Sequence, residues 1–256
     1  MKLIFTVTPG RSGSAYLTQL LGAVPGVEAQ HEPEPNFVHV MRRVQQNPAV
    51  AEVFLRECKL PALAAVTAEV YAETSHLVCK GFIEPIIRMG LRPGLIILRR
   101  PPREVAWSLF ERDTVPGRST AGFSYLLEPR DPNVLPLLGW ETATDYQLCF
   151  WYALEIERRQ LRYAAMARDM GLPVADVTNK ELNDWGAFSR MLGDLGGLPA
   201  TEEVRQAHAR ISGQRHNENK RRQAMPDGLD AAEQQIWDRI GHYEPLLADK
   251  VAKRYA

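Results

Sequence analysis

Short apolar runs alternate with longer amphipathic segments along the chain, and most of the runs end at turn-forming or charged residues. An apolar, β-branched run of this kind is typical of a strand that is buried on both faces of a parallel sheet. Such runs predict strands at residues 3–7, 77–82, 95–100 and 172–177, with a shorter strand at 27–30.

Apolar positions with helical spacing fill the intervals between these strands. They predict helices at residues 14–22, 37–44, 49–58, 60–73, 101–110, 143–170, 185–195, 231–239 and 243–253. Strands that alternate with helices predict an α/β fold. We expect a three-layer sandwich with a central, mostly parallel sheet flanked by helices and a P-loop-like first βα unit. Residues 113–140 break this pattern with repeated proline and glycine, so we expect residues 113–142 to form a loop that acts as a lid or binding segment.

Composition narrows the class of protein. We expect the 256 residues to form a single domain, and a formal net charge of zero argues against a dedicated nucleic-acid binder. No apolar stretch reaches membrane-spanning length, and the first predicted strand begins at residue 3, so the chain is expected to be cytoplasmic, with no membrane insertion. The isolated cysteines Cys58, Cys79 and Cys149 predict neither a disulfide framework nor a metal site.

The first strand leads into a small-residue turn that opens the first helix. Its residues are Gly10, Arg11, Ser12, Gly13, Ser14 and Ala15. A strand, a glycine-rich turn and a helix form an anion cradle, because backbone N–H groups and the helix dipole point into one space. The turn lacks the lysine of a nucleoside-triphosphate loop. Taken alone, the pattern also fits a plain strand–turn–helix junction with a surface arginine.

Together with a second motif, this turn resembles the family of sulfotransferases that use 3′-phosphoadenosine 5′-phosphosulfate (PAPS) as sulfuryl donor. In that family an arginine at a strand end and a serine eight residues later bind the donor's 3′-phosphate; Arg100 and Ser108 have that spacing here. The resemblance covers roughly the first 110 residues, with a weaker echo at 174–198. It implies that the turn from Gly10 to Ala15 holds the phosphosulfate, with Arg11 in contact with it.

The resemblance also implies catalytic residues. His31-Glu32-Pro33 follows the second predicted strand and is similar to the Glu-Pro motif of a bacterial branch of the family, so Glu32 is the first candidate base and His31 the second. Lys80, in the predicted strand at 77–82, would neutralise the leaving group. Arg215 and Lys220, in a basic C-terminal segment, would contact the 3′-phosphate, although the family's usual pattern is not matched there.

The expected reaction is sulfuryl transfer to a hydroxyl of a small-molecule, carbohydrate or lipid acceptor. Residues 33–75 and 113–142, with Tyr125 and Trp140, are the expected acceptor-selecting regions. A P-loop-type kinase of a small metabolite and a non-catalytic donor-binding protein of the same fold remain as alternatives. The sequence leaves open whether the chain forms a homo-oligomer.

Overall fold

The computed structural model describes residues 1–213 and 228–255. Two compact units are present. The first, here called the sheet unit, contains Met1–Arg99 and the segment that begins at Gln160. The second, the helical unit, contains Arg100–Arg159 and the C-terminal helices. The extent of a single domain over residues 1–256 stays a prediction.

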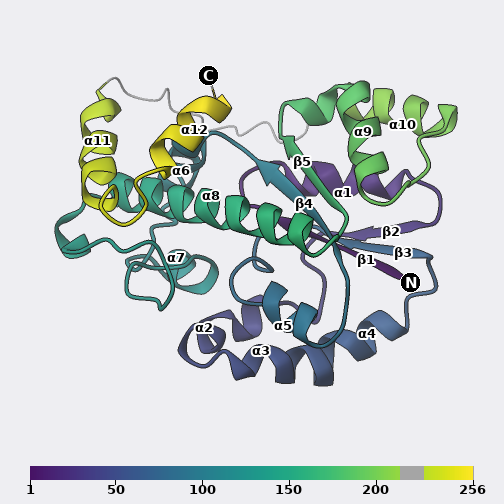
Figure 1. Ribbon diagram of the computed structural model, residues 1–256, viewed down its shortest axis with the longest axis horizontal. Helices are drawn as coiled ribbons and strands as arrows, with labels where there is room; N and C mark the ends of the chain where they lie inside the picture. Colours follow the sequence, from purple (N-terminus) through teal and green to yellow (C-terminus); the bar gives the residue numbers. More distant parts are fainter. Residues whose placement is uncertain (214–227, 256) are drawn as a thin grey trace. The chain divides into compact units, whose positions relative to one another are not determined.

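A five-stranded parallel sheet forms the centre of the sheet unit (Figure 1). Its strands are β1 (Lys2–Val7), β2 (Val27–Gln30), β3 (Val70–Glu73), β4 (Gly94–Arg99) and β5 (Val174–Thr178), in the order β2-β3-β1-β4-β5. All neighbours are parallel, so the carboxyl ends of the strands share one edge of the sheet. Ligands of open α/β sheets bind at that edge.

Helices cover both faces of this sheet, which confirms the predicted α/β sandwich. On one face, α1 (Ser14–Gly22), α9 (Trp185–Asp194) and α10 (Glu202–Ser212) pack their apolar side chains against the strands in one buried cluster (Figure 1). On the other side lie α2 (Val38–Gln46), α3 (Ala49–Phe54), the π-helix η1 (Leu55–Lys59), α4 (Leu60–Ala64) and α5 (Ile83–Arg88). A short 3-10 turn, η3 (Glu181–Asn183), connects β5 to α9.

The helical unit is built from α6 (Pro102–Phe110), α7 (Thr120–Tyr125), the 3-10 turn η2 (Trp140–Thr142), α11 (Leu229–Ile240) and α12 (Leu247–Tyr255). The long helix α8 (Asp145–Asp169) begins in this unit and continues into the sheet unit. In the sheet unit, the Gln160 side-chain amide of α8 donates to the carbonyls of Val7 (2.9 Å) and Leu98 (2.8 Å), where β1 and β4 end.

The predicted strand at 77–82 is wrong, and so is the end of the helix predicted at 60–73. The third strand is β3, and residues 77–82 form turns in which Lys80 N–H donates to the Leu77 carbonyl (2.9 Å) and Gly81 has φ +108°. Leu77 to Lys80 are all fully buried, so apolarity here marks a packed turn rather than a strand. In β3 the polar residues Tyr71 and Glu73 are buried, and their polar atoms are satisfied by each other and by Lys59, which lies outside the strand.

Candidate functional site

The turn after β1 has the backbone shape of an anion cradle. Gly10, Arg11 and Gly13 all have positive φ, at 78°, 57° and 85°. The buried Ser12 hydroxyl donates to the Gly10 carbonyl at 3.1 Å and tightens the turn. Helix α1 then begins at Ser14 with no side chain capping its N-terminus. The first N–H groups of a helix have no partner within it, so this end is suited to an anion.

Hydrogen bonds link this helix start to the ends of β2 and β3. The Thr18 hydroxyl donates to the Ser14 carbonyl (3.0 Å) and lies 2.6 Å from the Thr74 hydroxyl. His31 Nδ1 lies 2.7 Å from the Thr74 carbonyl oxygen. A carbonyl only accepts, so Nδ1 of His31 carries the proton and Nε2 is left as a proton acceptor. The cradle and His31, the second of the candidate bases, are therefore parts of one hydrogen-bonded edge.

A largely buried histidine, with 13% of its side-chain surface exposed, connects two of the sequence-predicted catalytic residues. His76 Nδ1 lies 2.8 Å from Lys80 Nζ, and His76 Nε2 lies 3.4 Å from Glu32 Oε1. A lysine ammonium has donors only, so Nδ1 accepts and Nε2–H faces the carboxylate. Burial, followed by the charges of Lys80, His31 and Arg11, lowers the pKa of His76 well below its ordinary value. The ring is therefore neutral at pH 7 and orients Glu32.

Glu32 is placed by its own backbone as well as by His76. It has φ +48°, a left-handed conformation that is costly for a residue with a side chain, and the Asn36 side-chain amide donates to its carbonyl at 2.8 Å. Its side chain keeps 25% of its surface exposed. The Glu32 carboxylate is oriented by His76 and remains partly exposed to solvent, so it is suited to accept a proton from a bound hydroxyl.

The sheet unit thus brings together most of the predicted site. The residues from Gly10 to Ala15, His31, Glu32 and Lys80 all lie at the carboxyl edge of β1, β2 and β3, although Lys80 comes from a turn and not from the predicted strand. His76 was not predicted. The signal that could have found it is the polar run Thr74-Ser75-His76, which follows β3 directly, but a helix was predicted up to residue 73.

The second predicted motif lies in the helical unit. Arg100 Nε donates to Glu104 Oε2 at 3.0 Å, and its side chain is 17% exposed. Ser108 is buried on α6. Their role toward a donor stays a prediction. Arg215 and Lys220 lie outside the described residues, and so does their predicted contact with the 3′-phosphate.

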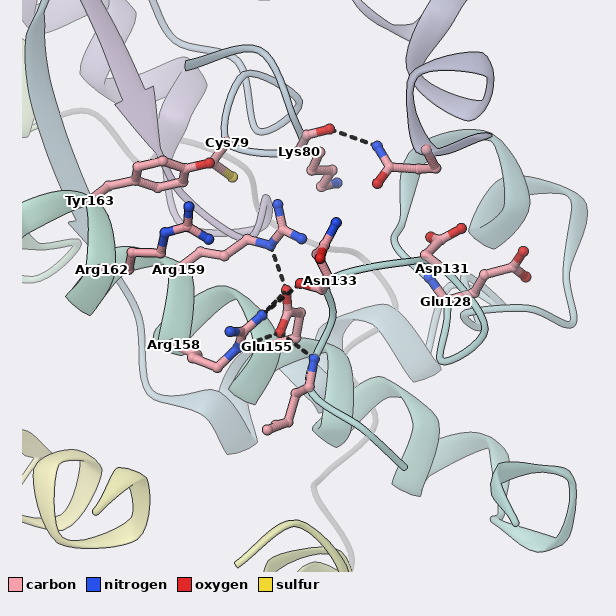
Figure 2. Close-up of polar contacts among 12 residues, drawn as sticks. Cys79, Lys80, Glu128, Asp131, Asn133, Glu155, Arg158, Arg159, Arg162 and Tyr163 are labelled. Carbon is pink, nitrogen blue, oxygen red and sulfur yellow. Dashed lines mark hydrogen bonds and ion pairs between the residues drawn. The ribbon is translucent and has the colours of Figure 1, made fainter. Parts of the chain in front are cut away.

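Part of the predicted acceptor loop is anchored to α8 within the helical unit (Figure 2). The carboxylate of Glu155, fully buried, accepts from Arg158, Arg159 and the backbone N–H of Leu135, the last at 2.9 Å. The Trp151 indole donates to the Leu135 carbonyl, and Arg158 donates to the Asn133 carbonyl, both at 2.9 Å. These bonds fix the loop's second half on the helix, while its role at an acceptor stays a prediction.

The helical unit also contains a cavity of about 640 Å³ whose walls are mainly apolar. Phe150, Trp237 and Tyr255 lie in its wall, and so does Arg103. The Arg103 guanidinium is engaged by Asp230 and by Glu233, whose Oε1 lies 2.8 Å from Arg103 Nε. Because its arginine is neutralised, this cavity is less suited to an anion than the turn after β1.

Among the described residues, no helix has the length and apolarity needed to cross a membrane. Over the same residues, no three His, Cys, Asp or Glu side chains form a group that could hold a metal ion.

Comparison with known proteins gives a structural match only. No protein-family model matches the sequence, and curated protein sequences give no match. Among solved structures, the chain is similar to a sulfotransferase domain from the curacin biosynthetic pathway. The TM-score is 0.55 at 12% identity, over 94% of this chain and 97% of that domain. The protein therefore has the α/β fold of a sulfotransferase domain.

Proposed function

We propose that the protein is a PAPS-dependent sulfotransferase, which moves a sulfuryl group from 3′-phosphoadenosine 5′-phosphosulfate to a hydroxyl of a small-molecule, carbohydrate or lipid acceptor. One observation carries the proposal. An anion cradle and two proton acceptors, Glu32 and His31, lie at the same edge of one sheet. The fold shared with a sulfotransferase domain supports the same reaction class.

Donor binding is assigned to two groups of residues. The backbone N–H groups of the turn from Gly10 to Ala15, with the Arg11 side chain, would hold the phosphosulfate. Arg100 and Ser108 would hold the 3′-phosphate, since a planar guanidinium fork and a hydroxyl both suit a phosphate dianion. Arg215 and Lys220 are further candidates for that phosphate.

The transfer step then needs alignment, charge stabilisation and one proton acceptor. Glu32 takes the proton of the acceptor hydroxyl, and the oxygen attacks sulfur in line with the departing phosphate. A new S–O bond forms as the bond between sulfur and the phosphate oxygen breaks, which leaves 3′,5′-adenosine bisphosphate. Arg11, together with Lys80, stabilises the charge on the leaving oxygen. His31, with Nε2 open, is the second candidate for the base.

A transfer screen with ³⁵S-labelled PAPS against a chemically diverse panel of hydroxyl acceptors tests the proposal. We expect label to appear on at least one acceptor class without added magnesium. Tight donor binding with no transfer to any acceptor would favour a non-catalytic binding protein. Magnesium-dependent ATP binding, with no binding of 3′,5′-adenosine bisphosphate, would favour a small-metabolite kinase instead.

A further inference from the structure

A buried lysine reaches the turn that carries Glu32. Lys59 is 1% exposed, and its Nζ lies 2.8 Å from Glu73 Oε2 and 3.1 Å from the Pro35 carbonyl oxygen. The ammonium also lies over the Phe37 ring, 4.7 Å from its centroid. Its contacts therefore join the end of β3 to the segment that follows Glu32.

Local structure explains how a charged side chain comes to lie there. Lys59 ends the π-helix Leu55–Lys59, and π-helical turns are frequent at functional sites. Glu73 is the last residue of β3 and is paired in register with Gln30, the last residue of β2. The turn at 31–36 leaves the sheet directly after Gln30, so Lys59 and Glu73 lie beside its base.

The charge pair is costly to bury. Burial raises the pKa of Glu73, while Lys59 and the Tyr71 hydroxyl, which donates to Glu73 Oε2 at 3.1 Å, oppose that rise. Glu32 is close enough for its charge to raise the pKa of Glu73 further. Buried ion pairs often contribute little net stability compared with a neutral replacement. If apolar side chains replaced both Lys59 and Glu73, the hydrogen bond from Lys59 to the Pro35 carbonyl would be lost.

Glu32 needs such anchors because its backbone is strained. A non-glycine residue with φ +48° persists only where the surroundings hold it. The turn is held at His31 by Thr74, at Glu32 by Asn36 and at Pro35 by Lys59. Of these anchors, Lys59 alone forms a buried ion pair, and the Glu73 carboxylate fixes its position.

We infer that Lys59 is a positioning residue: held by Glu73, it fixes the turn at 31–36 and so presents the Glu32 carboxylate for proton transfer. The last part of this inference rests on the proposed function, whereas the fixing of the turn does not.

Hydrogen exchange tests the turn independently of activity. In Lys59→Met, which keeps the apolar stem against Phe37, we expect the Asn36 and Val38 amides to exchange at least about tenfold faster, with the β1 and β4 amides unchanged. Both amides donate to side chains inside the turn. Arg88→Met, which breaks an exposed ion pair to Glu52 on α3, is the control and should leave these amides unchanged. Unchanged exchange in Lys59→Met would overturn the inference.

Kinetics test the consequence for Glu32. We expect Lys59→Met to lower kcat by about tenfold or more, with the Kd for 3′,5′-adenosine bisphosphate within about twofold of wild type. Lys59→Arg, which keeps the charge, should recover most of kcat. The double variant Lys59→Met/Glu73→Gln should recover the unfolding midpoint but not kcat, because it removes the unpaired buried charge without restoring the Pro35 contact.

The outcomes separate three explanations. Recovery of kcat together with the midpoint in the double variant would show that Lys59 acts through stability alone and would overturn the positioning role. A wild-type protein that transfers sulfate to no acceptor would refute the proposed function, and the exchange comparison would still decide whether Lys59 holds the turn.

Discussion

His76 Nε2 faces the carboxylate of Glu32 across 3.4 Å, while Lys80 Nζ lies 2.8 Å from the other ring nitrogen. The lysine therefore fixes the tautomer, and the tautomer fixes which atom points at the carboxylate. In the proposed reaction Glu32 is the proton acceptor and His76 orients it. Of the two candidate bases, Glu32 and His31, the His76 ring faces the carboxylate of Glu32, so variants of the two residues should have different effects on kcat.

Replacing Glu32 by glutamine should leave the affinity for 3′,5′-adenosine bisphosphate unchanged and lower kcat on the order of a hundredfold or more, because the amide cannot take the hydroxyl proton. Calorimetry and single-turnover transfer measure the two quantities. His31→Gln is the matched comparison and should lower kcat far less. If His31→Gln has the larger effect, the base is His31 and Glu32 supports it.

Removal of the Arg11 side chain should weaken the binding of 3′,5′-adenosine bisphosphate by at least about tenfold and abolish sulfuryl transfer. The reason is that a charge-assisted hydrogen bond to the phosphate is lost. Isothermal calorimetry of Arg11→Ala gives the affinity, and Arg11→Lys should retain part of it. Arg92→Ala, whose guanidinium donates to the Met170 carbonyl elsewhere in the sheet unit, is the control. Unaltered bisphosphate binding in Arg11→Ala would remove the turn from the donor site.

Two glycines of the cradle should respond differently to alanine. Both have positive φ, so Gly10→Ala and Gly13→Ala should each lose roughly 1–2 kcal/mol of unfolding free energy. A Cβ at Gly10 would lie 3.2 Å from His76 Cγ, whereas at Gly13 the nearest atom would be Asn179 Cβ at 3.9 Å. Only Gly10→Ala should therefore also displace His76 and lower kcat. Denaturant unfolding and kinetics on both variants check this, and equal kcat values would contradict the contact.

Acid should destabilise the protein through His76. Its pKa is lowered in the folded state from an ordinary value of 6.5, so below that pH the unfolded chain binds a proton that the folded chain does not. Stability should then fall as pH drops below 6.5, by up to about 1.4 kcal/mol per pH unit for this group. Urea unfolding at pH 7.5, 6.5 and 5.5 measures the slope, which should be shallower in His76→Gln.

Local sequence signals were sufficient for the parts of the site that follow obvious strands. Residues 3–7 and 95–100 are apolar runs that end at Gly10-Arg11 and at Arg100, so strand, turn and motif could be predicted together. β3 could not be predicted, because its buried Glu73 is paired with Lys59, a partner that no periodicity shows, and the buried Tyr71 hydroxyl donates to the same carboxylate. Because β3 was not recognised, His76 did not follow a predicted strand and was not identified as a candidate site residue.

The strand order also bears on how acceptor preference could be changed. In the described sheet, β2 is an edge strand that pairs with β3 alone, and β3 enters between β2 and β1 only after the chain has passed through α2–α4. Residues 31–69 are thus the connection between β2 and β3, and the sheet is complete only when this connection has brought β3 between β2 and β1. Exchanging it wholesale with another protein would remove Lys59, the buried ion-pair partner of Glu73 at the end of β3. On the expectation that residues 33–75 select the acceptor, redesign of specificity should change single surface positions on these helices and leave Lys59 and the β2–β3 register in place.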